Sequence, residues 1–379
     1  MLTPSFHILI RSRNKDEIMY KKIRPGKFWY DNNNKLIQAH AGAIIYCEGK
    51  YWWYGENKEG ITGNATPEPC KFRHHGLKLY SSEDLYNWVD EGFLFPESDD
   101  INNPFYPVNV IDRPHILYNE KNKEYVMWVK AGRRTGSNIN WTECTFAVCT
   151  GKDLKSMKYL HEFSPAPHNA GDFDLFVTDG KAYVVFENPH TAMILHELNE
   201  DYTGLSDKWS SHLEFECPPI VKEAPAFFEH NGRKYLFASG TTSYFANPSY
   251  VYDITDLHGE WKELGLACRN DRYENSFHAQ YSSVFKHPTI KDLYIALGDR
   301  WLLDCSVDMP NILDVFYSQF TKNPDVKPIM TKAERAELTD YDVSMATYVW
   351  LPVKFYENGV PYLEWRSSWQ LEEFEQGDI

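Results

Sequence analysis

One pattern constrains the fold of this 379-residue chain more than any other: an apolar run, a short polar turn and a second run rich in Tyr and β-branched residues. This is the pattern of a β-hairpin. It recurs six times at intervals of roughly 50–70 residues, the length of one four-stranded sheet in a β-propeller. The six segments are Ala41–Lys58, Asp112–Lys130, Asp174–Asn188, Lys222–Gly240, Tyr281–Trp301 and Thr347–Trp369.

A second motif lies between the hairpins. It is Asp-Leu with a Trp or Met four or five residues after the Asp. We expect it where a tight turn leads into the outer strand of a sheet. Its three copies are Ser81–Trp88, Thr150–Met157 and Ile254–Trp261.

Together the two motifs predict an all-β fold, a five-bladed β-propeller with a C-terminal closing hairpin. The sixth hairpin is expected to pair with the N-terminal region, so that the ring of sheets has no open edge. We therefore expect residues 1–36 to pack on or close the propeller and residues 37–379 to form it. One short helix is expected in Thr331–Leu338, where Thr331 and Glu334 form a capping-box pattern.

Charge and cysteine content narrow the classes of function and location. The chain has 54 Asp and Glu against 39 Lys and Arg, a net charge of −15, which disfavours binding to nucleic acid or to anionic membranes. No run is long enough for a membrane helix, and no secretory signal pattern stands at the N-terminus. Seven cysteines, an odd number without a C-x-x-C pair, favour free thiols in a reducing compartment, so we expect a cytoplasmic protein.

Acidic residues recur where the inner strands of the hairpins begin. In a propeller these strand starts converge on the mouth of a central channel, so residues far apart in the sequence would meet there. Glu223 is the clearest case, because it opens an otherwise apolar strand. The residues expected at this rim are Glu56, Asp112, Arg113, Asp172, Asp174, Glu223 and Gln280.

A carboxyl group held at a crowded, partly apolar rim beside other carboxylates has a raised pKa. Such a group stays protonated near neutral pH and can donate its proton to a leaving oxygen. Two carboxyl groups around one sugar ring are the usual requirement for hydrolysis of a glycosidic bond. The alternative is that these acids only solvate the channel mouth or pair with Arg113 and Lys222.

Further signals are weaker. His278 either lies in the channel beside a water molecule or cation or is a hydrogen-bonded core histidine. Thr241 and Thr242 either bind a substrate hydroxyl or are ordinary strand threonines. No zinc-ligand spacing, dinucleotide-binding motif, P-loop or G-x-S-x-G elbow is present, so no metal or cofactor site is predicted. A structural Ca²⁺ or other cation in the central channel stays open as an alternative.

At these positions the chain resembles glycoside hydrolase family 43, and within it the branch of exo-β-1,3-galactanases, or galactan 1,3-β-galactosidases. The matches extend from about Ile37 to Trp369 and are specific in combination. They are "IQAHAGAIIYCEGKYWWYGENK", "DRPHILYNEKNKEYVMWVK", "GDFDLFVTDGKAYVVFEN", "EAPAFFEHNGRKYLFASGTT", "AQYSSVF", "LGDRW" and "YVWLPVKF".

The resemblance implies a role for most of the candidates. Glu223 matches the general acid, and Asp172 matches the acid that tunes its pKa and orients it. Gln280 matches a glutamine proposed to hold the attacking water. Asp112, which replaces a Glu of that branch, Glu56 and Thr241 match sugar contacts. Three residues complete the candidate substrate-binding set by their predicted place at the channel: Arg113, Asp174 and His278.

The resemblance also implies inverting chemistry, in which one acid protonates the leaving oxygen while water attacks the opposite face. Most of the family has an Asp general base in the first blade, where this chain reads "QAHAGA" without Asp. A neutral amide is a poor base. Either Gln280 acts as its imidic tautomer, or it only positions water while Asp112 or Glu56 accepts the proton.

The resemblance therefore implies an exo-acting, inverting glycoside hydrolase that removes a terminal sugar, with β-galactoside favoured, from a short oligosaccharide. β-Xylosidase or α-L-arabinofuranosidase activity is the first alternative. A non-catalytic sugar-binding propeller, favoured by the missing first-blade Asp, is the second, and a protein-interaction propeller is the third. The stretch "NPHTAMILHEL" also lacks the Asn residues expected to contact a second sugar.

Overall fold

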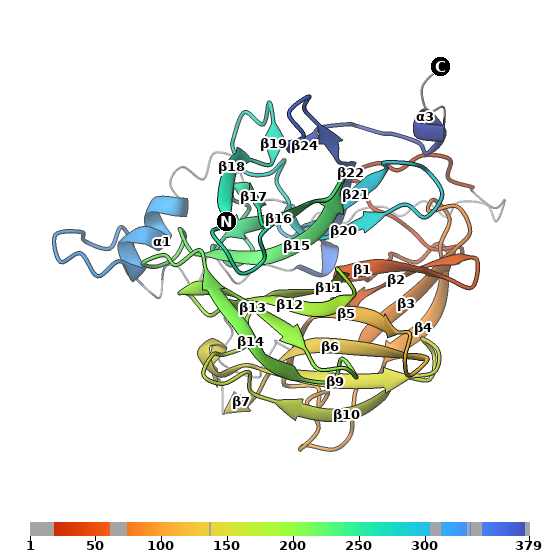
Figure 1. Ribbon diagram of the computed structural model, residues 1–379, viewed down its shortest axis with the longest axis horizontal. Coiled ribbons are helices and arrows are strands. Elements are labelled where there is room, and N and C mark those ends of the chain that lie inside the picture. The colour runs from red at the N-terminus through yellow and green to blue at the C-terminus, as the bar shows by residue number, and fades with distance from the viewer. Residues whose placement is uncertain are drawn as a thin grey trace, which may run out of the picture.

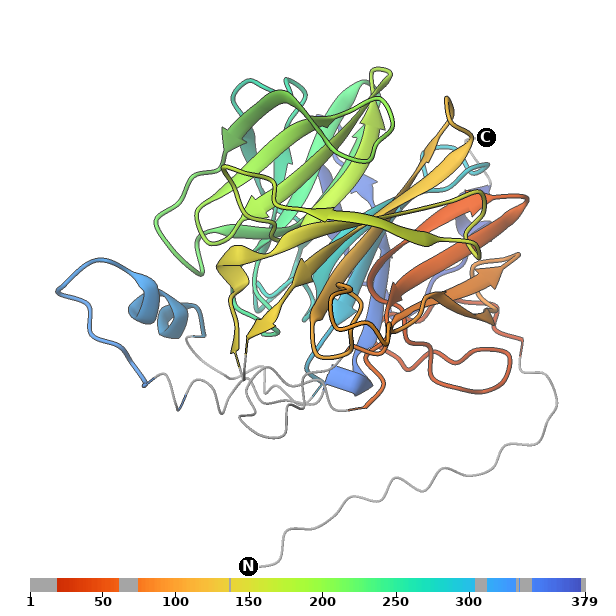
Figure 2. The ribbon, with the colours of Figure 1, turned by 90° about the horizontal axis from the view of Figure 1, so that it is seen from below.

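The computed structural model describes residues 19–60, 74–135, 138–303, 312–331, 334 and 343–375. These residues form an all-β propeller whose sheets surround a central axis (Figure 1). The helices in this part of the chain are short: α1 (Ile312–Phe320), α3 (Glu372–Glu375) and the 3-10 turns Trp141–Glu143 and Val343–Met345. None of the described helices is long and apolar enough to cross a membrane. Figure 2 shows that α1 projects away from the body of the sheets.

Four of the sheets have four antiparallel strands, and successive strands of each are neighbours. The first two comprise β1 (His40–Cys47), β2 (Lys50–Glu56), β3 (Leu77–Ser82) and β4 (Val89–Phe95), then β5 (Val110–Asn119), β6 (Glu124–Gly132), β9 (Thr145–Gly151) and β10 (Lys158–Phe163). The next two comprise β11 (Phe173–Thr178), β12 (Lys181–Asn188), β13 (Ala192–Leu198) and β14 (Leu205–His212), then β15 (Lys222–His230), β16 (Arg233–Gly240), β17 (Ser249–Asp253) and β18 (Lys262–Leu266).

The remaining described strands form smaller sheets. One three-stranded sheet contains β20 (Gln280–Lys286), β21 (Tyr294–Arg300) and β22 (Thr347–Pro352), and the other contains β19 (Cys268–Arg269), β24 (Pro361–Glu364) and β23 (Lys354–Phe355). β7 (Arg134–Thr135) and β8 (Asn138–Ile139) form a two-stranded ribbon. The described residues thus hold six sheets of three or more strands, one more than the predicted five.

The inner strands bring distant parts of the sequence together. β1 contacts β5, β5 contacts β11, β11 contacts β15, β15 contacts β20, and β20 returns to β1. Figure 1 shows the result, with the red first sheet beside the cyan and blue sheet of β20 to β22. Each of these inner strands begins a hairpin, so the five hairpins predicted between Ala41 and Trp301 are confirmed.

The predicted closing hairpin, Thr347–Trp369, is wrong in its pairing. β22 is the third strand of the sheet with β20 and β21, with Leu297 opposite Trp350, while β24 pairs with β23 and runs parallel to β19. All six residues of β22 are buried, so this strand belongs in the body of a sheet. The N-terminal residues meet this region through single bridges, Ile23 to Trp369 and Lys27 to Tyr348.

The Asp-Leu motifs lie where they were predicted, in the turns before the outer strands β4, β10 and β18. Each buries its Leu and its Trp or Met under the edge of a sheet, so each turn anchors an outer strand to the core. The buried pairs are Leu85 with Trp88, Leu154 with Met157 and Leu257 with Trp261.

The predicted capping box is confirmed. The Thr331 Oγ1 atom accepts a hydrogen bond from Glu334 N at 3.1 Å, and Thr331 N donates to Glu334 Oε2 at 2.7 Å. Residues 332–333 and 335–342 lie outside the described residues, so the helix predicted there stays a prediction.

Four inner strands carry a β-bulge just after their first residues, and in β1, β5 and β15 the bulge includes a residue with a left-handed backbone. These three bulges lie between His40 and Ala43, between Asp112 and His115 and between Glu223 and Ala226, and the fourth lies between Tyr281 and Ser283. One residue inside each of the first three has a left-handed backbone: Ala41 (φ 46), Arg113 (φ 52) and Ala224 (φ 50). A bulge bends the strand and re-aims its side chains, and a left-handed non-glycine residue costs on the order of 1–3 kcal/mol. These strands therefore carry strain where their side chains reach the channel.

The first bulge gives a stability prediction. A Cβ built on Gly42 would lie 1.7 Å from the carbonyl oxygen of Tyr54. This neighbour is backbone and cannot rotate away, so Gly42→Ala is expected to lower the free energy of unfolding by about 3 kcal/mol. Gly49→Ala is the control, because its site has a φ of +77 but no atom within 4 Å, and it should cost about 1 kcal/mol. Equal losses in urea unfolding would show that the close approach at Gly42 does not constrain the chain.

Candidate active site

The candidate site lies where the inner strands begin, at one end of the central axis. Glu223 is the second residue of β15, and Gln280 is the first of β20. Asp172 immediately precedes β11, and Asp112 lies at the start of β5. Glu56 ends β2, which runs antiparallel to β1 and so finishes where β1 starts. Four sheets and one loop thus contribute a polar side chain each to the same end of the propeller.

Glu223 has the carboxyl group expected of a proton donor. It is buried, and burial raises its pKa well above the ordinary value. The negative charges of Asp172 and Glu187 raise the pKa further. The cations Arg113 and Lys130 lower it, but their effect is smaller, so the pKa stays raised. The protonated form of Glu223 is therefore stabilised near neutral pH.

Asp172 is held as a carboxylate. Burial alone would raise its pKa, but Arg113 and Lys130 reverse that effect and hold the pKa well below its ordinary range. The Arg113 Nε atom lies 2.7 Å from Asp172 Oδ2, and the Lys130 Nζ atom lies 2.9 Å from Asp172 Oδ1. Lys130 also pairs with Asp112 at 3.2 Å. A permanent negative charge therefore stands beside Glu223.

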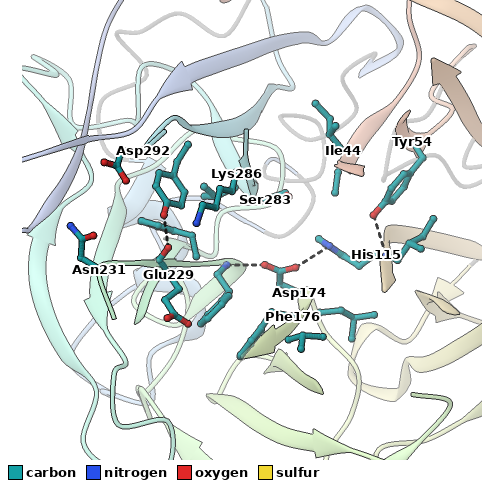
Figure 3. A pocket seen from close by; sticks show the side chains of 18 residues that line it. Ile44, Tyr54, His115, Asp174, Phe176, Glu229, Asn231, Ser283, Lys286 and Asp292 are labelled. Atoms are coloured by element: carbon teal, nitrogen blue, oxygen red, sulfur yellow. Dashed lines mark hydrogen bonds and ion pairs between the residues drawn. The ribbon is translucent and has the colours of Figure 1, made fainter. Parts of the chain in front are cut away.

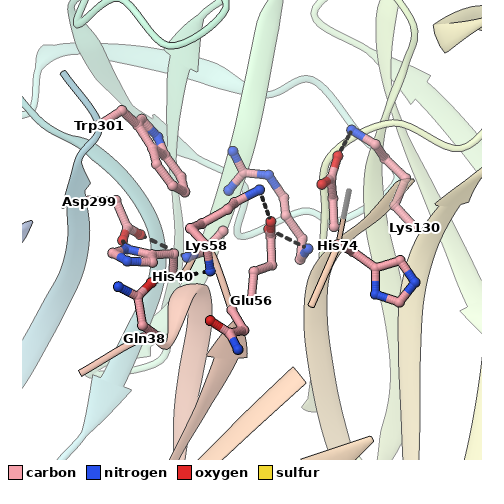
Figure 4. A network of polar contacts seen from close by, with 12 residues as sticks. Gln38, His40, Glu56, Lys58, His74, Lys130, Asp299 and Trp301 are labelled. Carbon is pink, nitrogen blue, oxygen red and sulfur yellow. Dashed lines mark hydrogen bonds and ion pairs between the residues drawn. The ribbon is translucent and has the colours of Figure 1, made fainter. Parts of the chain in front are cut away.

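Glu56 forms a second acid centre, paired with Lys58. The Lys58 Nζ atom lies 2.5 Å from Glu56 Oε2, and Arg113 N donates to Glu56 Oε1 at 3.0 Å. Burial raises the pKa of Glu56, Lys58 lowers it and Asp112 raises it, which brings it to about 7. Figure 4 shows this pair between Trp301 on one side and Lys130 on the other.

Arg113 joins the two acid centres. Its backbone N–H donates to Glu56, and its Nη2 donates to Gln280 Oε1 at 2.7 Å. Gln280 in turn donates from Nε2 to Glu223 Oε1 at 2.9 Å. Neighbouring carboxylates raise the pKa of the buried guanidinium, which burial alone would lower. Arg113 is therefore a permanent cation in contact with both sides of the site.

Three predicted substrate-binding residues lie apart from this network. The Asp174 carboxylate pairs with His115 Nδ1 at 3.0 Å and accepts from Phe227 N at 2.8 Å. Asp174 lines a separate cavity of about 490 Å³, which Glu223, Asp172 and Gln280 do not line (Figure 3). Asp172 and Asp174, although only two residues apart, thus lie in different polar environments.

Thr241 and His278 make other contacts. The Thr241 hydroxyl donates to Val221 O at 3.1 Å, so it links the residue after β16 to the residue before β15. Burial lowers the pKa of His278 to about 4, and the nearby Arg300 cation lowers it too. Arg300 donates to the carbonyl oxygen of His278 at 3.2 Å. Neither side chain is joined by a described hydrogen bond to the acids around Glu223.

The described residues contain no group of three or more His, Cys, Asp or Glu side chains placed to hold a metal ion. The acids around Glu223 are instead paired with Arg113, Lys130 and Lys58. These three cations of the protein thus neutralise charge on the carboxylates.

Comparison with known proteins gives the family. The sequence model of glycosyl hydrolases family 43 matches residues 65–295. The chain belongs to glycoside hydrolase family 43. No curated protein is significantly similar to it in sequence.

Solved structures of family 43 share the fold. A GH43 β-1,3-galactosidase is 25% identical with a TM-score of 0.73, and the match covers 94% of this chain and 64% of that one. A second GH43 β-1,3-galactosidase, solved with galactodeoxynojirimycin, is 23% identical with a TM-score of 0.71, covering 92% of this chain and 100% of that one. An exo-β-1,3-galactanase from Phanerochaete chrysosporium, solved with β-1,3-galactotriose, is 20% identical with a TM-score of 0.69, covering 93% and 68%. This chain thus spans less than two thirds of the first of these proteins.

In this family 43 chain, the sequence-based interpretation missed the residues that set the charge of the acids. Lys58 and Lys130 each stand at the end of a predicted β-hairpin, where a lysine is usually exposed, yet both are buried beside carboxylates. Glu187 was missed as well. It is buried, pairs with His190 at 3.0 Å and raises the pKa of Glu223. The only signal for the lysines was their place near a predicted acid: Lys58 follows Glu56 by two residues, and Lys130 ends the hairpin that Asp112 opens.

Proposed function

We propose that this protein is an exo-acting, inverting glycoside hydrolase that removes a terminal β-galactosyl residue, β-1,3-linked, from a short oligosaccharide. The observation that carries the hydrolase activity is the pair of buried carboxyl groups with opposite pKa shifts, Glu223 raised and Asp172 lowered. Two titratable groups whose environments separate their pKa values mark an acid and its charged partner. The named activities of the similar structures favour the β-1,3-galactoside.

In the proposed reaction Glu223 is the general acid. It gives its proton to the glycosidic oxygen as the bond between that oxygen and the anomeric carbon breaks. Asp172 keeps a negative charge beside Glu223, which holds the proton there until the leaving oxygen takes it. General acid catalysis contributes roughly 10²–10⁴-fold to such a step.

The water side of the reaction needs a proton acceptor opposite Glu223. Glu56 is the proposed acceptor, because its pKa of about 7 suits a base near neutral pH. Arg113 and Gln280 stand between Glu56 and Glu223 in a chain of hydrogen bonds. Inverting enzymes need such a gap for the attacking water. Asp112, whose one ion pair within the described part of the chain is with Lys130, is the alternative acceptor.

Two finer points are proposed with the function. We propose a five-bladed propeller, in which β19, β24 and β23 form an accessory sheet beside β20 to β22. The ring of contacts among β1, β5, β11, β15 and β20 supports this count. We also propose a cytoplasmic location, which the free thiols of all five described cysteines support.

Hydrolysis of a sugar panel tests the proposal. Wild type is incubated with 4-nitrophenyl β-galactoside, β-xyloside and α-L-arabinofuranoside, and with β-1,3-galactotriose. We expect hydrolysis of the β-galactoside and stepwise release of single galactose units, with α-galactose as the first product in proton NMR spectra. β-Galactose as the first product would exclude inversion. Preference for a xyloside or arabinofuranoside would show that the substrate is not a galactoside. Binding without turnover would indicate a sugar-binding propeller.

A further inference from the structure

The side-chain amide of Gln280 is held at all of its polar atoms. Its Oε1 accepts from Arg113 Nη2 at 2.7 Å and from Trp301 Nε1 at 3.2 Å. Its Nε2 donates to Glu223 Oε1 at 2.9 Å and to Ser239 Oγ at 3.2 Å. The side chain is buried, so these four contacts determine its orientation.

The chemistry of the neighbours fixes which end of the amide faces which way. An arginine guanidinium and a tryptophan indole can only donate hydrogen bonds. The amide atom that faces Arg113 and Trp301 must therefore be the oxygen. The NH₂ group then has to face Glu223, and it donates to one particular oxygen of that carboxyl group, Oε1.

We propose that Gln280 is a positioning residue for the general acid rather than a holder of the attacking water, and that Arg113 and Trp301 keep its amide in this orientation. This inference rests on the proposed function, in which Glu223 is that acid. Because Glu223 Oε1 accepts the N–H of Gln280, the transferable proton of Glu223 resides on Oε2. Gln280 thus decides which oxygen of the acid faces the leaving group.

The same contacts argue against Gln280 as the acceptor of a proton from water. Its carbonyl oxygen already accepts two hydrogen bonds, one of them from a cation. An imidic tautomer would place a hydrogen on Oε1, where Arg113 and Trp301 already point theirs. The nitrogen would also lose a hydrogen, although both Glu223 and Ser239 accept from it.

The two residues that orient Gln280 are themselves fixed. Arg113 is bound through Nε to Asp172 at 2.7 Å, so Asp172, Arg113, Gln280 and Glu223 form one continuous chain. Trp301 is buried in a cluster with Phe245 and Phe316 of α1. The buried cluster around the indole that orients Gln280 therefore includes one residue of α1.

The dependence on the leaving group tests this role. Gln280→Leu is compared with wild type on β-1,3-galactobiose, whose leaving oxygen needs a proton, and on 2,4-dinitrophenyl β-galactoside, whose leaving group departs without one. We expect a loss in kcat of about 10²-fold on the disaccharide and of about threefold or less on the dinitrophenyl galactoside, because the damage is to acid catalysis. Trp301→Phe keeps an aromatic ring but lacks the N–H, and it should show the same selectivity with a smaller loss.

The opposite result is equally clear. Similar losses on both substrates, with turnover restored by azide and formation of α-galactosyl azide, would place Gln280 on the water side and overturn the inference. If wild type hydrolyses no β-galactoside, the proposed function fails by itself.

The contact between Gln280 and Glu223 can also be tested by NMR, which does not require turnover. With ¹⁵N-glutamine labelling, the side-chain NH₂ signal of Gln280, assigned by its loss in Gln280→Leu, should move with the titration of Glu223. It should stop moving in Glu223→Gln. A signal that is independent of pH in wild type would overturn the contact between the two side chains.

Discussion

Replacing Glu223 by Gln is expected to lower kcat on β-1,3-galacto-oligosaccharides by about 10³-fold, because the amide keeps the size of the side chain but cannot give a proton. On 2,4-dinitrophenyl β-galactoside the loss should be small, since that leaving group departs without protonation. The measurement is kcat and KM on both substrates at several pH values. In wild type, activity should fall at alkaline pH, because Glu223 loses its proton above its raised pKa. This alkaline limb of the pH–activity profile should be absent in the variant.

The matched control is Glu229→Gln, the same change on the same strand. Glu229 lies near the other end of β15, accepts from Thr178 at 2.7 Å and lines the cavity of Asp174. This variant should retain the activity of wild type. A Glu223→Gln protein that still cleaves the disaccharide at the wild-type rate would remove Glu223 from the mechanism.

Glu223→Gln lowers activity but should not lower stability. A carboxyl group with a raised pKa binds its proton more tightly in the folded state, so stability falls as pH rises from the ordinary pKa of Glu towards the raised one. Gln has no such titration. The free energy of unfolding of Glu223→Gln should therefore equal or exceed that of wild type near neutral pH, and the difference should shrink on acidification. This part of the protein gives up stability to keep a proton donor buried.

The sequence was informative where the signals are local. Each of the five inner hairpins combines a turn with two adjacent runs, and each Asp-Leu motif buries a Leu within a few residues, so both could be predicted without knowledge of distant contacts. The strand-start acids followed from the geometry of a propeller. The last hairpin failed because its pairing is long-range: β24 joins β19, almost a hundred residues earlier in the chain.

The charge of the site was the part that sequence patterns could not give. Asp172 and Asp174 are only two residues apart, but one meets Arg113 and Lys130 and the other meets His115. Which acid stays charged depends on cations supplied by other strands. The role of Trp301 could not be predicted, because a hydrogen bond from an indole to a buried amide leaves no pattern in the sequence.

Replacing Asp172 by Asn is expected to damage both stability and catalysis. It leaves the buried charges of Arg113 and Lys130 without their shared carboxylate, and breaking such a buried pair costs about 3–5 kcal/mol. The lowered pKa of Asp172 means that its contribution is present above its ordinary pKa and is lost as pH falls. The difference in unfolding free energy between wild type and variant, measured in urea, should therefore be largest near neutral pH and shrink in acid.

The effect on catalysis should appear as a shift of the pH profile. Asp172 raises the pKa of Glu223, whereas Arg113 and Lys130 lower it, so removing the negative charge and keeping the cations lowers that pKa. The alkaline limb of kcat/KM should move to lower pH, and kcat near neutral pH should fall by about 10²-fold. Asp174→Asn is the control: it also breaks a buried pair, with His115, and should lose stability without moving the limb. A shift of equal size in both variants would mean that general destabilisation, rather than the charge beside Glu223, sets the profile.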